Sequence, residues 1–169
     1  MLSLIRVFWF ICVLRDGPQS LPQGKTLLHW MIVLHLLFGT LYSLPDTSLF
    51  KSLHQELALL LFNLGFVRVV LMLNKHPERF VQSATALLGA DVLISGTGLV
   101  LYVVLIQGLG LQALSDTVNI LLMLWSIIVT AHVFRHALDT SFALGLLLTF
   151  LLLLTSWTFL LVLQELMFA

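Results

Sequence analysis

SFALGLLLTFLLLLTSWTFLLVLQEL, from Ser141 to Leu166, is apolar along almost its whole length, and its one charged residue, Glu165, stands near the end. A transmembrane helix needs about 20 mainly apolar residues to cross a hydrocarbon layer about 30 Å thick. The segment exceeds that length and carries no charge in its middle. It therefore predicts a transmembrane helix.

Four further segments of the same kind precede it. The whole chain of 169 residues is 60% hydrophobic and 9% charged, with a mean hydropathy of +1.08, whereas a soluble domain has about 25% charged residues. The sequence predicts an all-α fold, a polytopic membrane bundle of five transmembrane helices. The four preceding segments run from about Thr26 to Leu44, Leu53 to Leu73, Phe80 to Ile106 and Thr117 to Phe134.

The first 14 residues, MLSLIRVFWFICVL, form a shorter apolar segment that Arg6 interrupts and Arg15 follows. Because it is too short to span a bilayer comfortably, we predict an interfacial amphipathic helix over residues 1–14. Trp9 would lie at the depth of the lipid headgroups, and both arginines would face phosphates. A cleaved signal peptide fits less well, since no small-x-small cleavage site follows.

Residues 15–25 separate this helix from the first span. Gly17 and Pro18 end the helix, and Pro22 disfavours α conformation in the residue before it. The sequence therefore predicts a hinge over 15–25 and a transmembrane domain over 26–169.

Short polar stretches mark the expected helix ends. Ser52 to Gln55 resembles a capping box, in which a serine hydroxyl and a glutamine side chain bond the first backbone N–H groups. The pair Ser115-Asp116 and the stretch Asp139 to Ser141 offer further N-cap oxygens. We expect helices to begin at these positions.

Lysine and arginine are distributed unequally between the two ends of the predicted spans. The far side holds only Lys51, and cytoplasmic loops of membrane proteins are enriched in these residues. We expect the N-terminus in the cytoplasm and the C-terminus outside, in a bacterial inner membrane. With Trp9, the predicted interfacial anchors on the cytoplasmic side are Arg6, Arg15, Lys25, Lys75, Arg79 and Arg135.

Gly24-Lys25-Thr26 matches the last letters of a phosphate-binding loop. Such a loop needs a glycine five positions before its second glycine, so that backbone N–H groups can surround the phosphate. That position is Gln19, and the nearest glycine, Gly17, is seven residues away. The motif also follows a hinge rather than a buried strand. We interpret Lys25 as a cytoplasmic anchor and predict no nucleotide binding.

The sequence contains no motif for several other common classes of chemistry. Eight acidic residues balance eight basic ones, and the bases form no stripe with aromatic residues, which argues against nucleic-acid binding. Cys12 is the only cysteine, so an intramolecular disulfide and a cysteine-rich metal cage are excluded. Serine, histidine and aspartate residues form no nucleophile elbow. We expect neither an enzyme nor a cofactor.

Arg68 and Asp91 are charged residues inside the predicted spans, and each costs about 3 kcal/mol in lipid on insertion scales. Arg68 lies about 9 Å of helix rise before Asn74, and Asp91 about 16 Å beyond Phe80. Both fall in the cytoplasmic half of adjacent spans, so a pair between Arg68 and Asp91 would lower the cost. The alternatives are that Arg68 extends to the interface, or that both residues belong to a proton or ion relay.

The stretch HVFRHALD places His132, His136 and Asp139 on one helical face, at i, i+4 and i+7. Three such side chains are a candidate metal-ligand set. However, no glutamate follows the first histidine, and the stretch lies at the cytoplasmic end of a span, where basic residues meet the negative end of the helix dipole. We favour the interfacial interpretation and predict no metal site.

Small residues line the third span. Ser83, Ala86, Gly89 and Ala90 would allow the backbones of neighbouring helices to approach closely. We predict that this span packs tightly in the bundle.

The five-span layout resembles that of Yip-type membrane proteins and similar bacterial inner-membrane proteins. The stretches NKHPERFVQSATALLGA and LWSIIVTAHVFRHALDTSFALGLLL carry the resemblance, with Phe80 before a small-residue helix and Trp125 leading the fourth span. It covers about residues 53 to 160. The resemblance implies an integral membrane scaffold whose partners are other membrane proteins, with no catalytic residues.

Two functions follow as expectations. The first is a non-enzymatic scaffold or accessory subunit, whose partners are the lipid bilayer and another membrane protein, or a second copy of itself. The second is a small transporter or channel component with a polar path near Arg68, Asp91 and Asn63. Because internal repeats and broken helices are not evident, the scaffold is the leading expectation.

Overall fold

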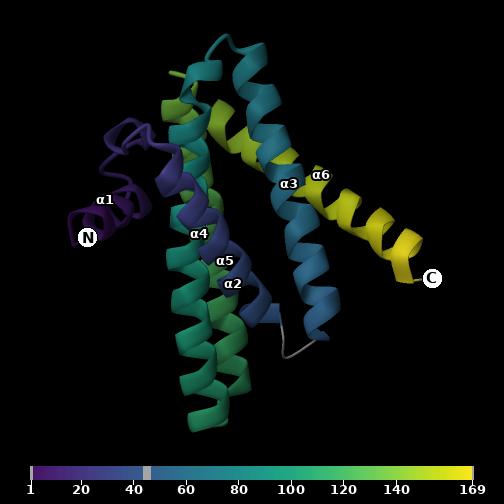
Figure 1. The fold of residues 1–169 in the computed structure, drawn as a ribbon. Helices are drawn as coiled ribbons and strands as arrows, with labels where there is room; N and C mark the ends of the chain where they lie inside the picture. The colour runs from purple at the N-terminus through teal and green to yellow at the C-terminus, as the bar shows by residue number, and fades with distance from the viewer. Residues whose placement is uncertain (1, 44–46, 169) are drawn as a thin grey trace.

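The computed structural model describes residues 2–43 and 47–168, and all of its regular elements are helices. Five of them are long and apolar enough to cross a membrane, so the chain is an integral, multi-pass membrane protein with an all-α fold (Figure 1). These five are α2 (Lys25–Ser43), α3 (Leu49–Leu73), α4 (Phe80–Tyr102), α5 (Gln112–Ala137) and α6 (Phe142–Phe168).

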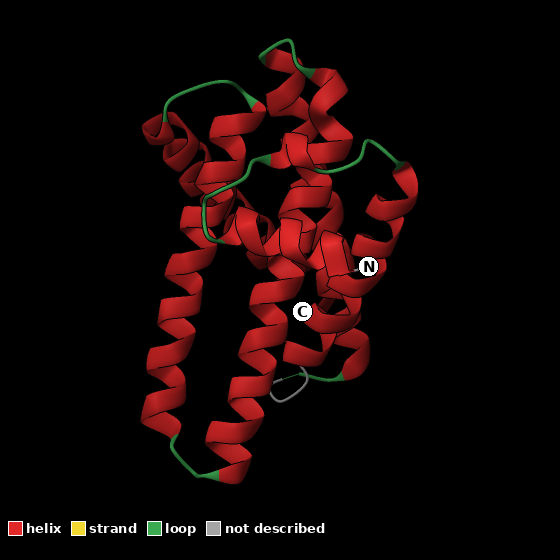
Figure 2. Cartoon of the chain, turned by 90° about the vertical axis from the view of Figure 1, so that its left-hand side faces the viewer, coloured by secondary structure: helices red, strands yellow, loops and turns green. Residues whose placement is uncertain are grey.

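The remaining elements are short. They are α1 (Leu2–Cys12), the single turns η1 (Pro18–Ser20) and η2 (Pro77–Arg79), and the π-helical segment η3 (Val103–Gly108), into which α4 continues. Viewed from the side, the described part of the chain consists of helices joined by loops, with no strand (Figure 2).

Helix α4 is the centre of the bundle, because α1, α2, α3 and α5 all contact it. Its small residues Ser83, Ala86, Gly89 and Ala90 are buried, which confirms the predicted close packing of this span. The sequence order of the helices therefore does not decide which are neighbours. In particular, α2 packs against α4 although α3 lies between them in the chain.

Helices α5 and α6 approach each other closely at Gly145. A Cβ atom at this position would lie 3.2 Å from the backbone nitrogen of Arg135 and closer still to the carbonyl oxygen of Ala131. Farther along, α6 diverges from α4 and α5 toward the C-terminus and crosses α3 (Figure 1). The rings of Phe62 and Phe159 stack there, with their centroids 4.6 Å apart.

Helix α1 docks on α4 and α5. Phe8, Ile11 and Cys12 are buried against residues of both helices, and Trp125 Nε1 donates a hydrogen bond to the carbonyl oxygen of Cys12 at 2.8 Å. Trp9 meets the ring of Trp125 edge to face, about 18 Å of helix rise from the C-terminal end of α5. The helix predicted over 1–14 thus ends at Cys12, and its headgroup depth stays a prediction.

Several predicted helix ends need correction. Helix α3 begins at Leu49, so Ser52 lies inside its first turn rather than at its cap, and Ser52 Oγ donates to the carbonyl oxygen of Thr40. Helix α5 likewise begins at Gln112, which places Ser115 within the helix. The cap at Ser141 is confirmed, since its Oγ accepts a hydrogen bond from the N–H of Leu144.

The predicted end of the first span, Leu44, lies outside the described residues.

Candidate functional site

A histidine and an aspartate meet in the middle of the bundle. His35 Nδ1 on α2 lies 2.7 Å from Asp91 Oδ2 on α4. Since an ionised carboxylate only accepts hydrogen bonds, Nδ1 carries the proton and donates it. The other ring nitrogen, Nε2, is then left to face α3.

The group on α3 is Glu56, whose Oε2 lies 4.0 Å from His35 Nε2. Its carboxylate lies over Gly39, one turn after His35 on α2. A Cβ atom at Gly39 would come within 2.6 Å of Glu56 Oε2, so the missing side chain makes room for this carboxylate. We call His35, Glu56 and Asp91 the polar cluster.

Two cavities of about 290 and 300 Å³ adjoin the polar cluster. Their linings share His35, Asn63, Asp91 and Ser126, so the two cavities adjoin each other between the helices, and we refer to them together as the polar space. This space extends along α5 from Asn119 to Thr130, which is about 16 Å and roughly half of the hydrocarbon thickness. The other polar residues that line it are Tyr42, Glu56, Ser95, Thr149 and Ser156.

Further hydrogen bonds hold the walls of this space in place. Tyr42 donates its hydroxyl to Asn119 Oδ1 at 2.8 Å, which links α2 to α5. Ser156 donates to Asn63 Oδ1 at 2.7 Å, which links α6 to α3. Each of the five spans therefore contributes a polar side chain to the lining.

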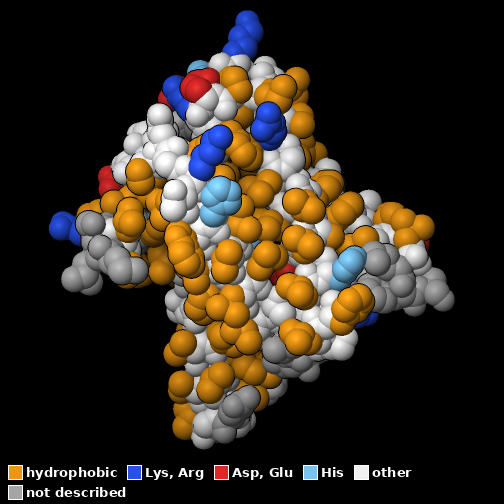
Figure 3. Space-filling model, viewed as in Figure 1, with side chains coloured by type: hydrophobic (Ala, Val, Ile, Leu, Met, Phe, Trp, Pro, Cys, Tyr) orange, Lys and Arg blue, Asp and Glu red, His pale blue; other side chains and the backbone are white. Residues whose placement is uncertain are grey.

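The polar cluster is accessible from the cavities. The exposed fraction of the side chain is 46% for Asp91, 22% for Glu56 and 13% for His35. Figure 3 shows acidic atoms surrounded by hydrophobic side chains near the middle of one face. A small ligand that enters the space can therefore touch a carboxylate.

The charges of the polar cluster do not balance. Two ionised carboxylates and one imidazolium carry a net charge of −1, and an uncompensated charge is costly where little water is present. Uptake of one proton, or of one monovalent cation, brings the net charge to zero. The arrangement is therefore chemically suited to bind one such ion.

The predicted pair between Arg68 and Asp91 does not form. Asp91 bonds His35, while the guanidinium of Arg68 lies 5.7 Å from the ring centroid of Phe80. The physical reason is depth in the membrane. Measured from the loop that joins α3 to α4, Arg68 lies about 9 Å along α3 and Asp91 about 16 Å along α4. The two residues are therefore about one helical turn apart in depth. Of the predicted polar path, Asn63 and Asp91 share a cavity, and Arg68 lies elsewhere.

The candidate metal ligands are not assembled into a set. The His132 and His136 rings meet edge to face at 4.5 Å between centroids, but His132 Nε2 bonds the carbonyl oxygen of Asp16. Asp139 Oδ2 instead pairs with Arg79 at 2.6 Å. Among the described residues, no group of three or more histidine, cysteine or acidic side chains is placed to hold a metal.

The predicted anchors fall into two groups. Arg79 has a structural role. Its Nη1 pairs with Asp139 and also donates hydrogen bonds to the carbonyl oxygens of His136 and Ala137 at the end of α5. Arg6 lies over the ring of Phe10. Arg6 is exposed, as are the other four basic anchors, Arg15, Lys25, Lys75 and Arg135.

Sequence reasoning missed His35 and Glu56. A signal was present, because each is an ionisable residue inside an apolar segment at a depth comparable with that of Asp91. The sequence does not show which helices pack together: the span next to α4 in the chain is α3, whereas the partner of Asp91 is on α2.

In comparisons with protein-family models, with curated proteins and with solved structures, nothing matches this chain.

Proposed function

We propose that this protein is a transport or channel component that binds one proton or one monovalent cation at the polar cluster. The observation that carries the proposal is the hydrogen-bonded His35 and Asp91, with Glu56 beside them, in a polar space that every span helps to line. Ionisable residues inside a membrane domain commonly mark ion pathways and proton relays.

Flux measurements on purified protein in liposomes test this proposal. A pH-sensitive dye inside the vesicles reports proton entry driven by a pH gradient, with the membrane potential clamped, and gradients of Na⁺ and K⁺ are tested in parallel. We expect the protein to dissipate at least one gradient faster than empty vesicles do. Asp91→Asn and Glu56→Gln should return the rate to that of empty vesicles.

The matched control is Asp116→Asn, which removes a carboxylate that is exposed on α5 and bonded to Gln112, away from the cavities. This variant should keep the flux of the unmodified protein. If well-folded protein dissipates none of the three gradients, or if Asp116→Asn and Asp91→Asn behave alike, the transport proposal is wrong.

A scaffold or accessory subunit is the second candidate, and the geometry of α6 favours it. Only 6% of the most apolar part of α6 is buried against other parts of the chain, against 28% for α5. Leu154 and Trp157 are exposed on it. The proposed partner is a helix of another membrane protein, in keeping with the resemblance to Yip-type scaffolds.

Site-specific photo-crosslinking in native membranes tests the scaffold. A photoreactive residue at Leu154 should yield one discrete heavier product if a partner covers α6. The same residue at Val33, which is exposed on α2, is the matched control and should crosslink to lipid alone. Equal products at both positions would contradict a specific partner on α6.

We also propose that the N-terminus is cytoplasmic and the membrane a bacterial inner membrane. The basic residues gather at the end of the bundle where α2 begins and α5 ends, which supports this orientation (Figure 3). A reporter active only in the cytoplasm should work when fused within Lys75 to Arg79 and fail at the C-terminus. Activity at the C-terminus would reverse the assignment.

A further inference from the structure

Another cavity lies apart from the polar cluster, at the end of the bundle where the basic residues gather. It has a volume of about 690 Å³ and lies between α2, α3 and the start of α4. Its polar lining is basic throughout, since it contains Lys25, His29, Arg68 and Lys75 and no acidic residue. Its apolar lining consists of Leu28, Met72, Pro77, Phe80 and Val81.

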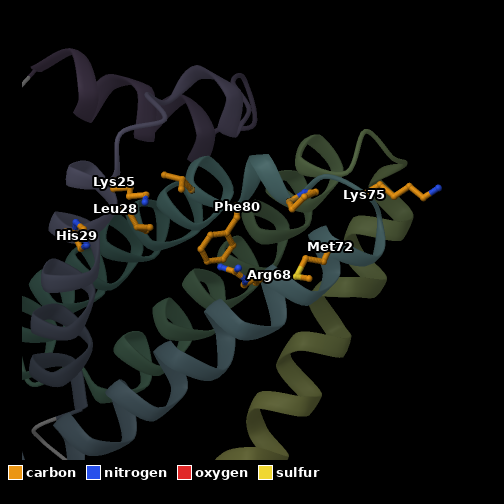
Figure 4. Close-up of a pocket in the computed structure, with 9 residues that line it drawn as sticks. Lys25, Leu28, His29, Arg68, Met72, Lys75 and Phe80 are labelled. Carbon is orange, nitrogen blue, oxygen red and sulfur yellow. The ribbon is translucent and has the colours of Figure 1, made fainter.

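The cations of this cavity have no counter-charge within the described part of the chain. No carboxylate of the described residues lies within ion-pair distance of Lys25 or Arg68. The guanidinium of Arg68 instead lies over the ring of Phe80. Figure 4 shows Lys25 and His29 on one side of the cavity and Arg68 beside Phe80 on the other. The side chain of Lys75 points away from its centre (Figure 4).

Arg68 is the informative residue. It lies five residues before the end of α3, about 8 Å of helix rise inside the apolar span, where an uncompensated guanidinium is costly. Guanidinium groups bind phosphate through paired N–H donors, and basic pockets between transmembrane helices on the cytoplasmic side bind anionic headgroups. A phosphate held between Lys25 and Arg68 would supply the missing counter-charge.

The apolar lining distinguishes a lipid from a soluble phosphate. Leu28, Met72 and Val81 offer no hydrogen bond to a small anion, but they can pack against the glycerol and the first methylene groups of acyl chains. We propose that this cavity binds the headgroup of an anionic phospholipid, with the phosphate between Lys25 and Arg68. The proposal does not depend on the polar cluster.

Native mass spectrometry of the purified protein tests the proposal, with phosphatidylglycerol and phosphatidylcholine of identical acyl chains as probes. We expect preferential retention of phosphatidylglycerol. Each of Lys25→Gln and Arg68→Gln should weaken its binding about fivefold, the effect of removing one surface charge near an anionic headgroup. Lys25→Arg should retain binding because it retains the charge.

Arg135→Gln is the matched control, since it removes an exposed base at the same end of the bundle but outside the cavity. It should leave the preference unchanged. Equal retention of the two lipids, or equal effects of Lys25→Gln and Arg135→Gln, would overturn the proposal. Because Lys25 is exposed at the first residue of α2, its substitution tests the site even if Arg68→Gln fails to fold.

A competition arm separates the lipid from other sources of phosphate. Inorganic phosphate, the deacylated headgroup glycerophosphoglycerol and ATP are each added in large excess over the lipid. We expect none of them to displace phosphatidylglycerol, because each lacks the acyl chains that meet the apolar lining. Displacement by any one would overturn the assignment to a lipid and identify a site for soluble phosphates.

Discussion

His35 Nδ1 donates a hydrogen bond to Asp91 Oδ2 across 2.7 Å and so joins α2 to α4 in the interior of a membrane domain. The bond orients the ring so that Nε2 faces Glu56. One histidine thus brings two carboxylates from different helices to one place. The proposed ion-binding site is built around this contact.

The energy of this contact can be measured by a double-mutant cycle. Hydrogen bonds between membrane helices average about 0.6 kcal/mol and reach about 1.7 kcal/mol, and a charged partner places this one in the upper part of that range. We expect His35→Ala and Asp91→Ala to show a coupling free energy of about 1 to 1.7 kcal/mol in thermal unfolding of the detergent-solubilised protein. Additive losses would show that the bond contributes nothing.

Gly39→Ala should disable the polar cluster without unfolding the protein. Its new Cβ atom meets the end of the flexible Glu56 side chain, which can rotate away at little cost. We therefore expect ion flux to fall while the unfolding temperature stays near that of Gly65→Ala. Gly65 is the matched control because a Cβ atom there meets nothing within 4 Å. Undiminished flux in Gly39→Ala would show that Glu56 need not lie beside His35.

Gly145→Ala, by contrast, should lower the stability of the fold. The atoms that its Cβ would meet belong to the backbone of α5, which cannot move aside independently. We expect a loss of about 1 to 3 kcal/mol in the free energy of unfolding, as for other overpacked positions. Gly65→Ala should instead be neutral or stabilising by up to about 1 kcal/mol, since alanine favours helix. Equal unfolding temperatures would contradict the close approach of α5 and α6.

The single cysteine reports whether α1 is docked. Burial raises the pKa of the Cys12 thiol to about 11, and the thiolate is the species that alkylating reagents attack. At pH 8 the folded protein should react roughly a hundredfold more slowly than the denatured chain. The rate should rise as the pH approaches the raised pKa, because the thiolate fraction then grows.

Phe8→Ala should accelerate this alkylation, because Phe8 lies against Gly89 and helps to hold α1 on α4. Ile5→Ala is the control, since Ile5 is exposed on the same helix. Labelling of the unmodified protein as fast as that of the denatured chain would show that α1 is not docked in solution.

The fold follows from the sequence to the extent that local signals decide it. The length of the apolar segments alone locates five membrane-spanning helices. The small residues around Gly89 identify α4 as the helix that packs closely against its neighbours. The errors arise where a polar residue has a tertiary partner. Ser52 resembles a cap, yet its hydroxyl bonds Thr40 on another helix, and α3 begins three residues earlier. A local pattern cannot reveal that partner.

The candidate site was predictable only in part. Asp91 and Asn63 stand out as polar residues in apolar segments, and the structure places both in one cavity. Their partners depend on which helix faces α4, and the small residues that permit close approach do not specify which helix approaches. His35 and Glu56 therefore became visible only once α2 and α3 were placed.

Proton uptake by the polar cluster is the most direct test of its assignment as an ion-binding site. Charge balance predicts that, in buffer without Na⁺ or K⁺, the unmodified protein takes up one proton at the polar cluster when the pH is lowered, seen as a carboxylic acid band in infrared difference spectra. Asp91→Asn and Glu56→Gln should each lose that band, because the positive charge of the histidine then equals the negative charge of the one remaining carboxylate. His35→Gln should take up two protons, because two carboxylates then remain without a base. A spectrum of the unmodified protein without such a band, or one that Asp91→Asn leaves unchanged, would contradict the account.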